Sequence, residues 1–203
     1  MKEIITVSRE FGSGGRELGK RLADALDYAY YDREIVTTLA AETGMDPNYL
    51  DRKLDQGSLL SSYPIHYAQS FNTVPDTATS ILTLQTRLIR KLAENGRCVI
   101  VGRAADVLLE DEHPFRLFVY ADQASKLARC RSRAAEGENL SDKEMLRQMK
   151  RIDKARAEFH DILAETPWGE RLSYDLGVNT SGLDIRGIVP SVAEYYRNWL
   201  RCR

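Results

Sequence analysis

Apolar residues follow two different spacings along this chain, and the two spacings alternate. Short apolar runs predict buried strands over residues 3–7, 29–31, 98–101, 115–120 and 176–179. Longer stretches with an apolar residue every three or four positions predict helices over residues 14–26, 33–43, 77–94, 123–135, 141–164 and 184–201. Strands that alternate with helices favour a parallel sheet covered by helices on both faces. We therefore expect an α/β protein of three layers, α/β/α, with a central parallel sheet.

Residues 55–76 interrupt this alternation, because Ser, Gly, Pro and Asn mingle there with aromatic residues. The polar residues predict a loop, whereas Tyr63, Tyr67 and Phe71 indicate a surface that contacts something. The segment is expected to be either a cover over a substrate or the contact of a homodimer.

A glycine-rich loop joins the first predicted strand to the first predicted helix. Over residues 8–19 it reads Ser-Arg-Glu-Phe-Gly-Ser-Gly-Gly-Arg-Glu-Leu-Gly. A strand, a glycine loop and a helix in this order cradle phosphate, because backbone N–H groups converge and the helix N-terminus adds partial positive charge. A phosphate loop of the usual form ends in Gly-Lys-Ser or Gly-Lys-Thr, and its lysine reaches the phosphates. Here Gly15 and Arg16 stand in those two places.

We predict that this loop binds the phosphates of a nucleotide. The predicted binding residues are Gly12, Ser13, Gly14, Gly15, Arg16 and Glu17. Arg16 replaces the lysine and offers a planar fork to phosphate oxygens, whereas Lys20, one turn later, is expected on the surface. A glycine turn that only closes a strand–helix unit is the alternative. The Gly-x-Gly-x-x-Gly spacing of a dinucleotide site does not follow the first strand.

Composition excludes several classes of partner. The formal net charge of −1 over 203 residues gives no general attraction to nucleic acid or to an anionic membrane. No apolar run approaches the roughly 20 residues of a membrane span, and the first residues lack the apolar run of a signal peptide. The three cysteines, Cys98, Cys130 and Cys202, lack metal-ligand spacing. We expect reduced thiols in a cytoplasmic protein.

The chain resembles the cytidylate kinase-like family of P-loop nucleoside monophosphate kinases. The resemblance rests on residues 4–15, Tyr31-Asp32, Val101-Gly102-Arg103, residues 152–156 and residues 178–181. The chain departs from the family at the two loop positions just described. It also has Val101 and Ala104 where the family has aspartates beside its Gly-Arg pair.

The resemblance implies a P-loop NTPase-like fold with a helical lid. Residues 1–203 would form one domain, in which residues 33–80 bind or cover the acceptor and residues 129–165 form the lid. Asp32 falls where the family has an aspartate near the acceptor nucleotide. Arg129, Asp153 and Arg156 match the lid pattern, and Asp153 would orient an arginine or a magnesium-bound water.

Phosphoryl transfer requires positioned cations more than covalent chemistry from the protein. Arg103 follows a central strand and is expected at the carboxyl edge of the sheet, where ligands bind in open α/β folds. Alternatively, Arg103 has a structural role and forms an ion pair with a nearby acidic residue. The expected catalytic residues are Arg16, Arg103, Arg129, Asp153 and Arg156, and the expected acceptor-binding residues are Asp32 and Arg103.

Two of these predictions have structural alternatives. Asp32 can cap the helix that begins at residue 33, either in place of binding the acceptor or in addition to it. A basic strip on the lid helices can instead be a solvated face with salt bridges. The strip consists of Arg129, Arg133, Arg147, Lys150, Arg151 and Lys154. The three histidines, His66, His113 and His160, lack ligand spacing and are expected to be structural or surface residues.

We expect ATP-dependent phosphoryl transfer to a nucleotide of the CMP or dCMP type, with Mg²⁺ bridging the β- and γ-phosphates of the donor. A protein that binds or senses nucleotides without transfer is the second reading, favoured by the missing loop lysine. A kinase of another small molecule, with residues 55–76 in its acceptor pocket, is the third. Nucleic acid ranks last, because no basic stripe interleaved with aromatic residues is present.

Overall fold

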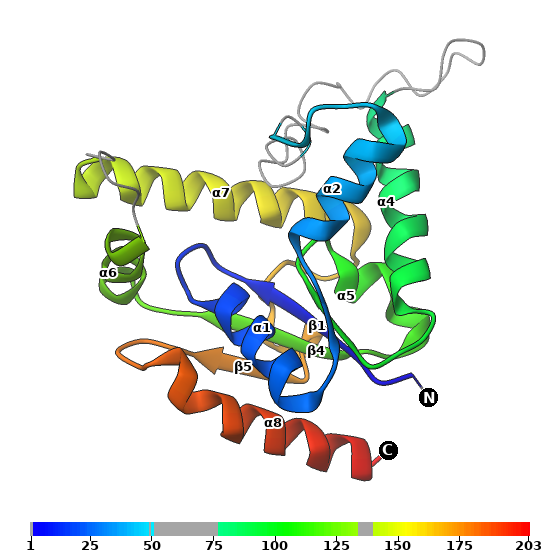
Figure 1. Ribbon diagram of the computed structural model, residues 1–203. Coiled ribbons are helices and arrows are strands. Elements are labelled where there is room, and N and C mark those ends of the chain that lie inside the picture. The colour runs from blue at the N-terminus through cyan, green and yellow to red at the C-terminus, as the bar shows by residue number, and fades with distance from the viewer. Residues whose placement is uncertain (1, 49, 51–76, 134–139) are drawn as a thin grey trace.

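The computed structural model describes residues 2–48, 50, 77–133 and 140–203 (Figure 1). Within these residues, parallel strands form one sheet in the order β2-β3-β1-β4-β5. The strands are β1 Ile4–Arg9, β2 Ala29–Tyr31, β3 Cys98–Val101, β4 Phe115–Tyr120 and β5 Leu176–Asn179. The predicted parallel sheet of an α/β fold is confirmed. The cover or dimer contact predicted over residues 55–76 lies outside the described residues.

Helices follow the strands in sequence, as the spacing of apolar residues predicts. They are α1 Gly15–Leu26, α2 Arg33–Thr43, α4 Thr77–Ala93, α5 Ala105–Leu108, α6 Gln123–Arg133, α7 Asp142–Leu163 and α8 Ile185–Arg201. Short 3₁₀ helices occupy Glu110–Glu112 and Arg171–Ser173. The described ends lie within one or two residues of the predicted ones. Helix α5 was not predicted, because four residues are too few to show a helical repeat.

Strand residues alternate between two apolar cores, one on each face of the sheet. Ile4 and Ile100 pack with α2, α4 and α5, whereas Ile5 and Val101 pack with α1 and α8. Figure 1 shows α8 beneath the sheet and α2 and α4 on the opposite side. Successive strand side chains point to opposite faces, so both faces must be apolar, and this explains the continuous apolar runs.

The fold places chain turns together at the carboxyl ends of the strands. β1 leads into the glycine loop and α1, β3 leads into α5, and β4 leads into α6. Because β1 lies between β3 and β4, these three turns are neighbours at one edge of the sheet. None of the described helices is long and apolar enough to cross a membrane.

Candidate active site

The glycine loop is held in shape from within. Gly12 and Gly14 have φ of +77° and +85°, a left-handed conformation that glycine adopts without steric cost. The Ser13 hydroxyl is buried and donates a hydrogen bond to the Glu10 carbonyl at 2.8 Å. It also accepts a hydrogen bond from the Gly15 N–H at 3.4 Å. Ser13, predicted to bind phosphate, therefore uses its side chain to close the loop, and α1 begins directly after Gly14.

Gly15 occupies the usual lysine position and has no room for a side chain. A Cβ atom there would lie 2.5 Å from Cβ of Arg9 and 3.2 Å from Cβ of Val119. Real Cβ atoms do not approach others as closely as the first distance. The packing of the loop against the ends of β1 and β4 thus explains why this chain has glycine there.

Arg16 and Asp32, predicted for opposite ends of the reaction, contact each other. Nε of Arg16 lies 2.5 Å from Oδ2 of Asp32, and Nη2 donates to Oδ1 at 3.4 Å. The Asp32 side chain is 4% exposed and that of Arg16 is 43% exposed. Asp32 makes no side-chain cap for α2, so the capping alternative is wrong. Two of the five guanidinium N–H groups serve Asp32, which leaves three for a ligand.

Arg129 connects α6 to the glycine loop and to the turn after β5. Its Nη1 donates to the Ser13 carbonyl at 3.4 Å and to Oγ1 of Thr180 at 3.2 Å. Its Nη2 donates to the carbonyls of Thr180 and Leu183, the latter at 3.0 Å. The side chain that was predicted as catalytic is thus engaged by backbone, which is the geometry of a positioning residue.

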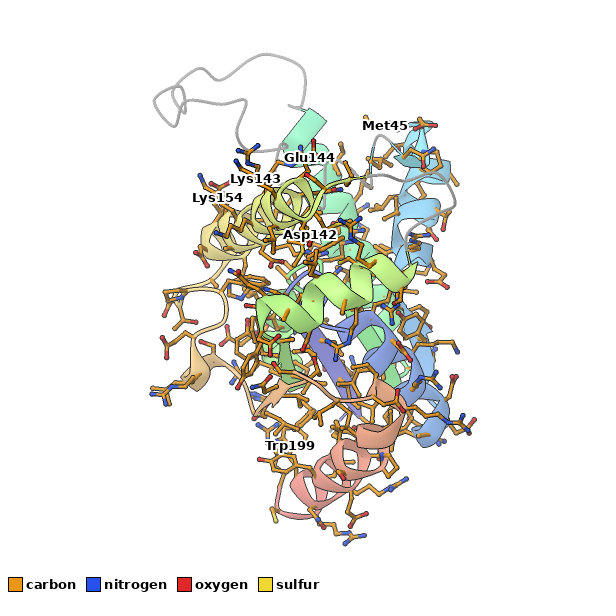
Figure 2. The ribbon with its side chains drawn as sticks, turned by 90° about the vertical axis from the view of Figure 1, so that its left-hand side faces the viewer. Met45, Asp142, Lys143, Glu144, Lys154 and Trp199 are labelled. Atoms are coloured by element: carbon orange, nitrogen blue, oxygen red, sulfur yellow. The ribbon has the colours of Figure 1, made fainter. Side chains whose placement is uncertain are left out.

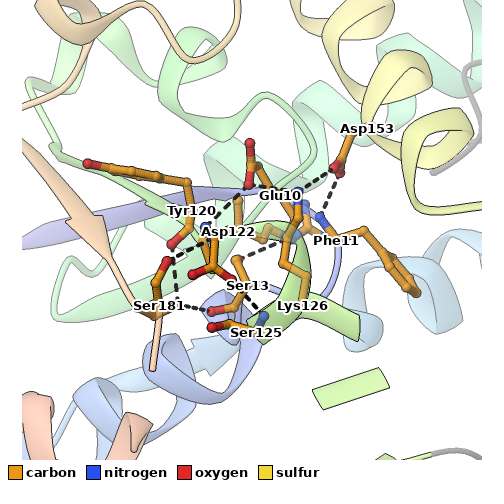
Figure 3. Close-up of polar contacts among 12 residues, drawn as sticks. Glu10, Phe11, Ser13, Tyr120, Asp122, Ser125, Lys126, Asp153 and Ser181 are labelled. Atoms are coloured by element: carbon orange, nitrogen blue, oxygen red, sulfur yellow. Dashed lines mark hydrogen bonds and ion pairs between the residues drawn. The ribbon is translucent and has the colours of Figure 1, made fainter. Parts of the chain in front are cut away.

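Asp153 and Lys126 hold the first half of the loop (Figure 3). The Phe11 N–H donates to Oδ1 of Asp153 at 2.6 Å. Nζ of Lys126 lies 3.0 Å from Oε2 of Glu10 and 3.9 Å from Oδ2 of Asp153. Burial raises the pKa of Asp153, although the Phe11 N–H, Arg156 and Lys126 oppose the rise. Lys126 was not predicted from the sequence, where its available signal was its place one turn before Arg129.

Arg156 continues the same set of contacts from α7. Its Nη1 donates to the Arg9 carbonyl at 3.2 Å and lies 3.5 Å from Oδ1 of Asp153. Its guanidinium also lies 5.8 Å from the ring centroid of Phe11. Arg129, Asp153 and Arg156, which were predicted to belong to a lid, therefore all contact the glycine loop in this structure.

A cavity of about 390 Å³ opens between the loop, the start of α2, and the helices α6 and α7. The predicted residues that line it are Gly12, Gly14, Gly15, Arg16, Arg129 and Arg156. It is lined by six arginines, namely Arg9, Arg16, Arg33, Arg129, Arg133 and Arg156, and by the carboxylate of Glu10. Such a concentration of guanidinium groups beside a glycine loop suits a ligand with several phosphate oxygens.

Several predicted residues lie behind the wall of this cavity. Asp32, Asp153 and Ser13 are not among its described lining residues and act through the contacts given above. Glu17 also lies outside the lining and pairs with Arg21 and Arg133. These residues therefore contact side chains or backbone of the cavity wall and do not face the cavity themselves.

Arg103 also lies behind the main cavity, in an unusual turn. Gly102, Arg103 and Ala104 have φ of +73°, +63° and +51°, and the last two cost about 1–2 kcal/mol each in that conformation. Arg103 is 6% exposed and lines a small cavity of about 20 Å³, which Arg9 and Arg156 also line. It does follow β3 at the carboxyl edge of the sheet, as predicted, but it is not among the described residues that line the main cavity.

Two polar side chains of the cavity wall have no partner among the described residues. Arg33, the first residue of α2, and Gln148 of α7 make no hydrogen bond or ion pair there. Neither was singled out from the sequence, because an arginine or glutamine on a helix usually indicates a solvated face. The position of Arg33 directly after Asp32 was the available signal.

Most of the predicted basic strip is a solvated face. Arg147, Lys150, Arg151 and Lys154 are exposed, and Lys154 lies 3.6 Å from Glu158. Figure 2 shows Lys154 on the outer side of α7, together with Asp142, Lys143 and Glu144 near the start of the helix. The main cavity is not lined by any of the four exposed residues of the strip, Arg147, Lys150, Arg151 and Lys154.

His160 is buried at the other end of α7. Its Nε2 lies 3.2 Å from Oδ2 of Asp106 and its Nδ1 lies 3.3 Å from Oδ1 of Asp161. Burial lowers the pKa of His160, but hydrogen bonds and attraction from the two aspartates outweigh burial and raise it. The contact joins α7 to α5, in keeping with the structural role expected for this histidine.

The comparisons with known proteins agree with this fold and loop. The model of the family described as "Cytidylate kinase-like family" matches residues 4–182. A search of curated proteins finds no match. Among solved structures, an uncharacterized protein from Eubacterium ventriosum is similar, with 26% sequence identity and a TM-score of 0.69. The match covers 97% of this chain and 99% of that chain.

More distant structures share the fold alone. A shikimate kinase from Bacteroides thetaiotaomicron has 15% identity and a TM-score of 0.57, with 99% of each chain covered. A gluconokinase from Sinorhizobium meliloti has 16% identity and a TM-score of 0.53, with 98% of this chain and 93% of that chain covered. The chain therefore has the fold of P-loop kinases.

Proposed function

The chain belongs to the cytidylate kinase-like family, and from this premise we propose that it transfers a phosphoryl group from ATP to a nucleoside monophosphate of the CMP or dCMP type. The observation that carries the proposal is the arginine-lined cavity beside the glycine loop. Phosphoryl transfer requires cations around the oxygens of the transferred group and an in-line approach of the acceptor. A cavity that gathers guanidinium groups from four segments of the chain supplies such an environment.

The donor phosphates bind along the loop and the start of α1. The backbone N–H groups of Gly14 and Arg16 lie there at a helix N-terminus, which favours anions. Arg16 takes the part of the missing lysine with its three remaining N–H groups, and Asp32 holds its guanidinium in place. Arg129, Lys126 and Asp153 keep the loop in shape for this binding.

The acceptor phosphate binds to Arg33 at the start of α2. Arg33 lines the cavity without a partner among the described residues, so its guanidinium is available to a ligand. The partial positive charge at the N-terminus of α2 adds to that attraction. These two observations support a phosphorylated acceptor over a neutral one.

The donor set near the loop is compatible with Mg²⁺. Glu10 lines the cavity with a carboxylate, and Lys126 contacts one of its two oxygens. Magnesium in kinases is usually held by one or two carboxylates together with substrate phosphates and water. Glu10 would thus help to hold the ion, which when bound neutralises charge on the donor phosphates.

Phosphoryl-transfer assays with ATP and Mg²⁺ test this function against CMP, dCMP, UMP, AMP and GMP. We expect transfer to CMP or dCMP, and a loss of turnover on the order of 10³-fold in Arg16→Ala, because an arginine that stabilises the transferring group contributes that much. Lys20→Ala, one turn away on the exposed side of α1 and paired with Asp24, is the matched control and should leave turnover unchanged. A modest loss in Arg16→Ala would remove Arg16 from the reaction.

A second candidate is a protein that binds nucleotides without transfer. It is favoured by the closed space at Gly15 and by the Ser13 hydroxyl, which serves the loop itself. Calorimetric binding of ATP, together with no transfer to any of the five acceptors, would support this candidate against the kinase.

The reducing interior of the cell suits this chain. Cys98, Cys130 and Cys202 form no disulfide with one another. Few and scattered cysteines in the sequence are typical of proteins kept in a reducing compartment, and we propose that the protein is cytoplasmic.

A further inference from the structure

Gln148 is an amide without a protein partner in the wall of the proposed active site. Its side chain lines the main cavity, is partly buried, and makes no hydrogen bond with any residue that the structure describes. A partly buried amide gains nothing from the protein in this state, because polar groups that leave water normally find partners. Its four donor and acceptor sites are therefore available to a ligand in the cavity.

The position of Gln148 along α7 separates it from the phosphate-binding loop. Arg156, which donates to the Arg9 carbonyl at the loop, follows Gln148 by eight residues on the same helix. At a rise of about 1.5 Å per residue the two lie roughly 12 Å apart along the helix axis. Gln148 therefore lies away from the loop that holds the donor phosphates, and it lines the same cavity as Arg33, so an acceptor whose phosphate binds Arg33 can turn its base toward Gln148.

Apolar side chains accompany Gln148 in the cavity wall. Met145 lies one turn before it on α7, and Phe11 enters from the glycine loop. The backbone of Phe11 is tied to Asp153, and Figure 3 shows its ring projecting away from the polar contacts around that carboxylate. An aromatic ring and a thioether are favourable neighbours for a planar aromatic group.

We propose that Gln148 is the specificity-determining residue for the base of the acceptor nucleotide. Its amide hydrogen-bonds the polar edge of the base, whose ring lies against Phe11 and Met145. An amide both donates and accepts, so it complements the amino group of cytosine together with the adjacent ring nitrogen. Because an amide also binds after a half-turn, it complements uracil as well. Gln148 thus selects a nucleotide over a phosphate that carries no base, and this inference rests on the proposed function.

Calorimetric titrations of the full chain with CMP, UMP and ribose 5-phosphate test the inference. Gln148→Met keeps the length of the side chain and removes its hydrogen bonds. We expect it to bind CMP and UMP about tenfold more weakly, a typical consequence of losing such bonds, and to bind ribose 5-phosphate as the wild type does. Lys150→Ala, exposed on the same helix and outside the cavity wall, is the control and should change none of the three.

The outcomes separate this inference from the proposed function. If wild type binds CMP no more tightly than ribose 5-phosphate, or if Gln148→Met weakens both equally, the inference is overturned, whatever the transfer assay gives. If CMP is phosphorylated and Gln148→Met binds it normally, the inference fails while the kinase function stands. If CMP is not phosphorylated but binds in the base-dependent way described, Gln148 keeps its role and the proposed reaction fails. An unchanged melting temperature of Gln148→Met shows that the variant is folded.

Discussion

Gly15 is the residue at which this loop differs most in consequence from the usual phosphate loop. Its α-carbon faces the side chain of Arg9 and the end of β4, so that any Cβ there meets Arg9 at 2.5 Å. The lysine is therefore excluded by packing, and Arg9 itself lines the cavity from the same spot. The sequence thus has glycine at the one loop position where the packing leaves no room for a lysine side chain.

Restoring the lysine should harm the protein. We expect Gly15→Lys to lower the free energy of unfolding by about 1–3 kcal/mol, the usual effect of overpacking, and to leave turnover no higher than in wild type. Urea denaturation and the transfer assay measure the two effects. Gly187→Lys is the matched control, because Gly187 lies in the first turn of α8 with only Oδ2 of Asp184 near a built Cβ, at 4.0 Å. A Gly15→Lys variant as stable as wild type would show that the close contact is easily relieved.

For single residues, the sequence predicted which side chains lie near the cavity better than it predicted which side chains contact each other. The loop glycines, Arg16 and Arg156 do line the cavity, because a glycine run and a family pattern locate them, whereas Ser13 and Glu17 do not line it. The contact between Arg16 and Asp32 could not be predicted from the sequence, because it depends on how α1 and β2 lie relative to each other. Arg33 and Gln148 were missed for a different reason: a polar residue on a helix gives the same sequence signal whether it faces a cavity or water.

Helix α6 is joined to the rest of the molecule through polar side chains, among them Lys126, Arg129 and Arg133. Arg129 donates to the loop at Ser13 and to the turn after β5 at Thr180 and Leu183. No described residue of α6 is itself buried. The helix therefore depends on polar contacts of this kind more than on apolar packing.

Removing Arg129 should loosen the loop as well as α6. We expect Arg129→Ala to lower the free energy of unfolding by about 1–3 kcal/mol, because it leaves backbone acceptors without their donor. Arg131 also lies on α6, and its exposed ion pair is with Asp142 at the start of α7. Arg131→Ala breaks only this pair and should lower the free energy of unfolding by about 0.5 kcal/mol or less. Urea denaturation of the two variants measures the difference. Equal, small losses would mean that Arg129 acts on the ligand and not on the fold.

Element boundaries were predicted well because caps and apolar spacing are local signals. α7 begins after Ser141, which forms a reciprocal cap with Glu144, and such a cap is readable from four residues of sequence. The three-residue turn 102–104 and the short α5 carry no such signal. They are set by the strands and helices around them.

The whole molecule is nearly neutral, yet its charge is unevenly arranged. The formal net charge is −1, whereas six arginines and one carboxylate line the main cavity. Summed charge therefore gave no indication of this local concentration of arginines. The concentration belongs to the tertiary structure, because its arginines come from segments up to 147 residues apart, as Arg9 and Arg156 show.

An anion of several charges should stabilise the folded chain. We expect pyrophosphate to bind where the arginines are gathered, so at about one hundred times its Kd it should add roughly 2.7 kcal/mol to the free energy of unfolding and raise Tm by about 5–10 °C. Thermal denaturation with and without pyrophosphate measures this, with sodium chloride at matched ionic strength as the control. An equal rise in both salts would contradict a specific anion site.

The closed position at Gly15 also affects how such a protein is detected. Nucleotide reagents that acylate a loop lysine depend on an amine beside the donor phosphates, and residues 8–19 of this chain contain none. A survey of kinases with these reagents would leave the loop unlabelled even in an active enzyme. Reagents that modify guanidinium groups would instead react within the cavity, and nucleotide would protect against them.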